Sequence, residues 1–254
     1  MPELPEVQAL AERLDAALAG RTLAAVEPLG FAALKTVDPP PAALVGRRAA
    51  SVGRRGKYLV LDLGGPRLLV HLSQAGRVDV EDPPKRTRPR GAVARFRFDE
   101  GPALLVREHG TERKAAWWVL AEGDEGPLAK LGPEPGSDAF AELILHGDDR
   151  RRVHTLLRDQ RTVAGIGRGY ADDALHRAGV SPYATLASLA PERRRVLLDA
   201  VRGPWRTRWR PSAPAPVDSR PPASATASPS TGAPGSRAPG AARRCGACPT
   251  SPTR

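Results

Sequence analysis

The sequence has little cysteine and no long hydrophobic run. Its two cysteines, Cys245 and Cys248, cannot build the disulfide framework of a small secreted domain. No apolar stretch approaches the roughly 18–20 residues that span a bilayer. The acidic start Met1-Pro2-Glu3-Leu4-Pro5-Glu6 also lacks the apolar core of a secretory signal. We therefore expect a cytoplasmic protein without a membrane partner.

Positive charge is in excess, but it is unevenly distributed. The formal net charge of the whole chain is +11. Residues 203–254 hold eight arginines and a single acidic residue, a net charge of +7, which leaves +4 for residues 1–202. A mildly basic body is compatible with an anionic polymer such as DNA as partner, but it does not identify one.

The hydrophobic periodicity predicts an α+β fold with two domains. Val7, Leu10, Leu14 and Leu18 follow at helical spacing and predict an N-terminal helix. Short β-type runs separated by Gly, Pro and Asp turns then predict an antiparallel β-sandwich, so that residues 1–125 form one domain. The predicted strands are residues 22–26, 58–63, 67–72, 78–80, 93–98, 103–107 and 117–120. After a predicted hinge at residues 122–135, helical periodicity marks a second domain at 134–202, with helices at 138–146, 151–160, 170–178 and 191–202.

The composition changes abruptly at residue 203. Residues 203–254 hold 11 of the 27 prolines and show neither a helical nor a strand period. Such a segment cannot bury enough apolar surface to offset its ordering entropy, so we predict a disordered tail. The change falls within a predicted helix, and this composition is what a GC-rich gene encodes out of frame. A C-terminus altered by a change of reading frame is therefore one interpretation of the tail.

Pro2 is the sharpest chemical feature of the sequence. Once Met1 is removed, Pro2 exposes a secondary amine, and an α-amine with a pKa of about 7.7–8.0 is partly unprotonated at neutral pH. Such an amine can form a Schiff base with a carbon electrophile. Glu3 and Glu6 lie within one helical turn of it and can act as general acid or base. An ordinary helix start, where Pro and Glu are favoured, is the alternative interpretation.

Five segments, the N-terminal one included, resemble in order and spacing the formamidopyrimidine-DNA glycosylase and endonuclease VIII family. They are the N-terminal sequence, a basic strand entry, a wedge loop, an interdomain hinge and a helix–two-turn–helix motif, at residues 1–7, 53–59, 71–77, 131–135 and 159–175. A glycine-rich turn that follows a helix, at residues 165–169, does not have the strand context of a dinucleotide-binding loop.

The resemblance implies a bifunctional DNA glycosylase and AP lyase that excises oxidised bases in base excision repair. Pro2 would attack the sugar C1′, Glu3 would be the main acid or base, assisted by Glu6, and Lys57 would bind phosphate and transfer a proton. The partner would be double-stranded damaged DNA, bound by a nucleoid-associated monomer. The resemblance places DNA-binding residues in the wedge, on the surface and in the glycine turn, at Gln74, Arg90, Arg113, Lys114, Arg150, Gly167 and Arg168.

The sequence also departs from the family pattern. Gln74 replaces the more usual Met, as in the endonuclease VIII branch, and Ala115 replaces a stacking Phe. His154 stands where the family usually has Lys, and Arg168 where it usually has Asn.

The largest departure is in the zinc hairpin. Relatives carry a structural zinc on four cysteines, whereas Cys245 and Cys248 supply a single pair of ligands. We therefore expect no metal or other cofactor in this chain. A DNA-binding protein of the same fold, with weak or no catalysis because its C-terminus is altered, is the alternative function.

Overall fold

The computed structural model describes residues 2–110 and 113–207, with side chains up to residue 203. The predicted N-terminal helix is confirmed as α1 (Leu4–Leu18). It begins after Glu3, whose backbone N–H donates to Glu6 Oε2 at 3.1 Å, and Pro5 stands in its first turn. Its buried face consists of Leu4, Val7, Ala11, Leu14 and Leu18.

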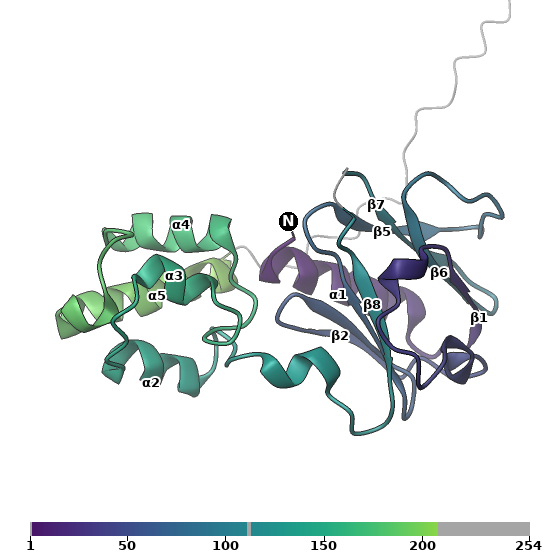
Figure 1. Cartoon of the computed structure of the whole chain (residues 1–254), viewed down its shortest axis with the longest axis horizontal. Helices are drawn as coiled ribbons and strands as arrows, with labels where there is room; N and C mark the ends of the chain where they lie inside the picture. The colour runs from purple at the N-terminus through teal and green to yellow at the C-terminus, as the bar shows by residue number, and fades with distance from the viewer. Residues whose placement is uncertain (1, 111–112, 208–254) are drawn as a thin grey trace, which may run out of the picture. The chain divides into compact units, whose positions relative to one another are not determined.

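The predicted β-sandwich is confirmed as two four-stranded antiparallel sheets, drawn in Figure 1. One sheet has the order β1-β6-β7-β5, and its strands are β1 (Leu23–Pro28), β6 (Ala92–Phe98), β7 (Ala103–Glu108) and β5 (Gly76–Glu81). The other has the order β2-β3-β4-β8, and its strands are β2 (Ser51–Arg55), β3 (Tyr58–Asp62), β4 (Arg67–His71) and β8 (Ala116–Leu120).

The sequence analysis missed one strand, β2. Its burial alternates, but only Val52 reaches the core, and Gly53, Arg54 and Arg55 follow it. The strand forms because β3 pairs with it along its whole length, from Ser51 opposite Asp62 to Arg55 opposite Tyr58. Pairing of this kind leaves little trace in a period-2 hydrophobic pattern.

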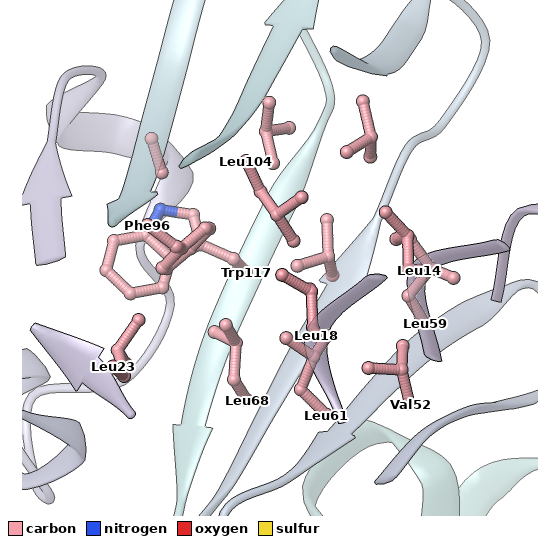
Figure 2. Packing of buried hydrophobic residues seen from close by; sticks show 14 of the residues in the cluster. Leu14, Leu18, Leu23, Val52, Leu59, Leu61, Leu68, Phe96, Leu104 and Trp117 are labelled. Atoms are coloured by element: carbon pink, nitrogen blue, oxygen red, sulfur yellow. The ribbon is translucent and has the colours of Figure 1, made fainter. Parts of the chain in front are cut away.

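The core of the sandwich fixes α1 in place. Leu14 and Leu18 from the helix pack with Leu59 and other apolar side chains of the strands, as Figure 2 shows. Phe96 and Trp117, from different sheets, meet edge to face with ring centroids 5.5 Å apart, a favourable geometry for an aromatic pair. A helix held along its length in this way gives Pro2 and Glu3, at its start, a defined position.

Among the described residues, four α-helices follow the β-sandwich (Figure 1). They are α2 (Asp138–His146), α3 (Val153–Arg158), α4 (Arg168–Ala178) and α5 (Pro191–Thr207), and a 3₁₀ helix, η3 (Gly126–Lys130), precedes them. Ser137 caps α2 by accepting a hydrogen bond from Phe140 N at 3.2 Å, and Gly179, with φ 61°, ends α4.

Two helix boundaries differ from the prediction. Helix α3 is shorter than the predicted 151–160, because Arg151 at one end forms ion pairs with Asp149 (2.7 Å) and Asp159 (2.8 Å). At the other end, Asp159 Oδ1 accepts from Arg161 N at 3.0 Å and turns the chain out of the helix. Helix α4 starts at Arg168, two residues before the predicted start.

Helix α5 continues past the change in composition at residue 203. The predicted end at residue 202 is wrong, because the helix runs to Thr207. Leu197, Leu198 and Val201 bury its inner face, and Arg202 donates to the Pro135 and Ser137 carbonyls. The rest of the predicted disordered tail, from residue 208 on, lies outside the described residues. Within the described part of the chain, no helix has the length and apolarity needed to cross a membrane.

Candidate active site

Glu3 joins the start of α1 to the start of α4. Its carboxylate accepts hydrogen bonds from the backbone N–H groups of Gly167 (2.7 Å), Gly169 (3.0 Å) and Tyr170 (3.2 Å). The side chain is 8% exposed. Because the first N–H groups of a helix lack intrahelical acceptors and carry partial positive charge, they hold this buried carboxylate in one orientation.

The glycine turn is shaped by this contact. A Cβ at Gly167 would lie 2.4 Å from Glu3 Cδ, and one at Gly165, where φ is +96°, would lie 2.2 Å from Leu4 Cδ1. Leu4 N also donates to Gly165 O at 3.1 Å. The Gly167 N–H donates to Glu3, and the prediction that Gly167 takes part in DNA binding stays a prediction.

Pro2 borders a hollow of about 330 Å³. Glu6, in the first turn of α1, faces the same space, and its Oε1 is 3.4 Å from the Tyr170 hydroxyl. The apolar part of the lining is Leu10, Leu72 and Val78, and the cationic part is Arg13 and Arg77. The sequence analysis singled out neither arginine, because Arg13 reads as part of the exposed face of α1 and Arg77 as an exposed strand residue. The lining can therefore accept an uncharged surface next to an anion.

Lys57 is buried at the turn between β2 and β3, with 7% of its surface exposed. Burial lowers the pKa of its ammonium group; the carboxylate of Glu3 acts in the opposite direction, and the positive charge of Arg158 lowers the pKa further. Lys57 therefore lies within electrostatic reach of Glu3, and the structure brings together two of the predicted catalytic residues.

His71 is a neighbour of Lys57 that the sequence analysis did not single out. It pairs across the strands with Tyr58, and the two rings are 4.8 Å apart. Burial, followed by the positive charge of Lys57, lowers the pKa of His71 to about 4, so the imidazole is neutral at neutral pH. The signal that could have identified it is a lone histidine at the end of a strand and at the first position of the wedge-loop segment.

Arg54 and Arg55, which lie close to Lys57 in the basic strand entry, are ion-paired with the hinge. Both bind the hinge residue Glu134, at 2.7 Å and 2.9 Å, and Gly56 N donates to the same carboxylate at 2.8 Å. Burial alone would raise the pKa of Glu134, but the charge of Arg54 and these hydrogen bonds outweigh burial and lower it. The two arginines thus fasten β2 to the hinge.

The wedge loop and the loop before β8 lie side by side. Gln74 is exposed at the tip of the turn between β4 and β5, and His109 N donates to the neighbouring Ala75 O at 3.1 Å. Arg113 and Lys114 are exposed in the second loop. The buried carboxylate of Glu108 fixes the end of this loop by accepting from Lys114 N and Ala115 N, each at 2.7 Å.

The remaining predicted DNA-binding residues are exposed at separate places. Arg90 lies in the loop between β5 and β6, and Arg150 in the loop between α2 and α3. Arg168, in the first turn of α4, is 3.7 Å from Asp172, which also pairs with His154 at 2.9 Å. The structure does not bring Arg90 and Arg150 to the Glu3 site by any recorded contact among the described residues.

The donor set does not fit the family's zinc site. Within residues 2–110 and 113–207, no group of three or more His, Cys, Asp or Glu side chains could hold a metal ion. Cys245 and Cys248, the only thiols of the sequence, lie outside the described residues and amount to half of a four-cysteine site. No step of the chemistry below uses a metal.

Comparison with known sequences gives matches to both domains. The sequence profile of the formamidopyrimidine-DNA glycosylase N-terminal domain matches residues 1–112, and that of the formamidopyrimidine-DNA glycosylase H2TH domain matches residues 131–203. The formamidopyrimidine-DNA glycosylase of Heliobacterium modesticaldum is 37% identical over 219 residues, which cover 80% of this chain and 76% of the relative. That of Thermus thermophilus is 37% identical over 209 residues, which cover 80% and 73%.

Solved structures give the same result. The MutM (Fpg) protein of Thermus thermophilus is 33% identical, with a TM-score of 0.67 over 80% of this chain and 74% of the other. Lactococcus lactis formamidopyrimidine-DNA glycosylase, solved noncovalently bound to DNA that contains an AP site, has the same fold at 23% identity, with a TM-score of 0.70 over 78% of each chain. Both domain profiles and several relatives above 30% identity therefore show that this chain belongs to the formamidopyrimidine-DNA glycosylase family.

Proposed function

We propose that this chain is a bifunctional DNA glycosylase and AP lyase that removes oxidised bases from double-stranded DNA through a Schiff base on Pro2. The observation that carries the proposal is the arrangement of Glu3. A buried carboxylate directly after Pro2 is fixed by three backbone N–H groups and lies within electrostatic reach of Lys57. An ordinary helix start needs neither the burial nor the partner helix.

The chemistry follows from the groups at the start of α1. The free Pro2 amine attacks C1′ of the damaged nucleotide, the bond from C1′ to the base breaks, and the base leaves with the bonding electron pair and a proton from an acid. Glu3, held beside Pro2, supplies and receives protons as the sugar ring opens and the iminium ion forms. Removal of a C2′ proton then expels the 3′ phosphate by β-elimination.

The residues around the site have complementary tasks. Lys57, with its lowered pKa, pairs with a phosphate next to the reacting sugar and can exchange a proton there. Gln74 and Arg113, on adjacent loops, fill the space that the extruded nucleotide leaves in the duplex. Structural relatives have been solved in complex with DNA that contains an AP site or a carbocyclic 8-oxo-G. These complexes support damaged DNA as the partner of this chain.

A second candidate function is DNA binding with weak or no catalysis. The observation that favours it is the donor set, because two cysteines cannot complete the zinc hairpin that the family resemblance implies. The two candidates differ in whether a covalent bond to DNA forms.

Covalent trapping tests the proposal. The protein without Met1 should form an adduct with AP-site duplex in the presence of borohydride, which reduces the iminium ion. Pro2→Gly should impair trapping severely, and an N-terminal extension that blocks the amine should abolish it. Normal trapping by the blocked protein would exclude Pro2 as the nucleophile. Tight DNA binding by the unblocked protein without any adduct would establish the second candidate instead.

A further inference from the structure

The segment between β5 and β6, residues 82–91, crosses the outer face of its sheet. β5 and β6 are both antiparallel to β7, so they run parallel to each other, and the segment must return along the whole length of the sheet. Phe96 and Phe98 of β6 point into the core, whereas Arg95 and Arg97 alternate with them and face the segment.

Two guanidinium groups fasten this segment to the sheet. Arg95, 1% exposed, donates to Thr87 O at 2.6 Å, and Arg97 donates to Lys85 O at 2.7 Å. Arg95 is neutralised by Glu81 (2.9 Å) and Glu27 (3.1 Å), and Arg97 also pairs with Glu27. Glu27 and Glu81 are therefore already engaged with strand arginines, and Asp82 is the one acidic residue within the segment itself.

The segment carries four cationic side chains against the single carboxylate of Asp82. Lys85, Arg86, Arg88 and Arg90 are all exposed. The sequence has no acidic residue from 83 to 98, and among the described residues no ion pair is recorded for any of the four. A backbone held to the sheet by hydrogen bonds from Arg95 and Arg97 presents these charges in defined positions, which favours a regular polyanion as ligand over a flexible one.

One end of the segment joins the edge of the proposed DNA site. Glu108 N donates to Gly91 O at 2.9 Å, and the carboxylate of the same Glu108 holds the loop that carries Arg113. From that edge the segment extends along β5 for six residues, which is about 20 Å at the rise of a strand. This length matches about six base pairs of duplex.

We infer that Lys85, Arg86 and Arg88, named here the cationic strap, bind the phosphate backbone of the duplex that flanks the lesion. The inference takes one element from the proposed function, namely that DNA binds next to the loops that carry Gln74 and Arg113. The strap adds phosphate contacts outside the reacting nucleotide and takes no part in base removal.

The test compares a strap variant with a matched control on duplexes of two lengths. Lys85→Ala/Arg86→Ala/Arg88→Ala removes three charges from the strap, and Arg47→Ala/Lys130→Ala/Arg195→Ala removes three exposed charges elsewhere. The ligands are AP-site duplexes of about 10 and about 30 base pairs; in the shorter one the lesion lies about two base pairs from the end on the strap side, so that this duplex ends before the strap. Because Arg88 also donates to Leu29 O, Lys85→Ala/Arg86→Ala serves as a second strap variant that keeps this bond.

The strap variants should bind the long duplex about five- to tenfold more weakly at low salt, with a salt slope smaller by about two. The affinity of the strap variants for the short duplex should change by less than about twofold. The affinity of the control variant should change by less than about twofold for both duplexes. Equal weakening on both lengths, or the same weakening in the control, would overturn the inference. Borohydride trapping at saturating DNA should be normal in every variant. If the unaltered protein gave no adduct, but the strap variants still lost affinity for the long duplex alone, the proposed Pro2 chemistry would be wrong and the inference about the strap would stand.

Discussion

Glu3 Oε2 accepts a hydrogen bond from Gly167 N at 2.7 Å, and a Cβ at position 167 would lie 2.4 Å from the carboxyl carbon of Glu3. The two residues are 164 positions apart in the sequence. The start of the helix with the proposed nucleophile is therefore set by the start of a helix in the second domain.

Gly167→Ala should therefore reduce catalysis although it replaces no catalytic residue. The added methyl group must displace the Glu3 carboxylate, and we expect the single-turnover rate of base excision to fall at least about tenfold, since a positioned acid or base contributes about 10²–10⁴-fold. Gly53→Ala is a matched control, because nothing lies within 4 Å of its added Cβ. An unchanged rate in Gly167→Ala, with an unchanged melting temperature, would show that the position of Glu3 does not matter for the chemistry.

The affinity for DNA should fall at alkaline pH as Lys57 loses its proton. Burial lowers the pKa of its ammonium group, so the positive charge that pairs with phosphate is lost at a lower pH than for an exposed lysine. Lys57→Ala should lower the salt slope of binding by about one. Lys57→Arg, which stays charged, should keep the slope and remove the alkaline loss of affinity. Binding to a duplex with a non-cleavable abasic analogue measures both effects without interference from the Pro2 amine. The same pH profile in Lys57→Arg and the unaltered protein would assign the alkaline loss of affinity to another group.

Long, periodic elements could be predicted from the sequence, and contacts between elements could not. The core faces of α1 and α2 follow a helical period, so their spacing alone predicts them. Strand β2 has one core residue and exists because β3 pairs with it. Likewise, the family resemblance predicted Glu3 and Lys57 as site residues. Only the structure shows that the Gly167 N–H donates a hydrogen bond to Glu3 and that Arg54 forms an ion pair with Glu134.

His71 should make the folded state sensitive to mild acid. Its pKa is about 4 in the folded protein, because of burial and then the charge of Lys57, against an ordinary value of 6.5. The unfolded chain therefore binds the proton first as the pH falls, and folding stability is lost between about pH 6.5 and pH 4. The loss attributable to this group is on the order of 2–3 kcal/mol. His71→Phe, which keeps an aromatic ring against Tyr58, should flatten the pH dependence over that interval. Urea unfolding at pH 7 and pH 4.5 measures the difference, and an equal loss in both proteins would place the acid sensitivity elsewhere.

Catalysis should be independent of zinc in this chain. The proposed chemistry uses Pro2, Glu3 and Lys57, all of which belong to the first domain, and two cysteines provide half of a tetrahedral thiolate site. We expect metal analysis to find well under one zinc per chain, and we expect borohydride trapping to proceed at the same rate with and without a chelator. Cys245→Ser/Cys248→Ser should trap as the unaltered protein does. Stoichiometric zinc in the monomer, together with loss of trapping on chelation or in the serine variant, would mean that the cysteine pair finds further ligands within the chain. The tail would then have to be counted as part of the DNA-binding machinery.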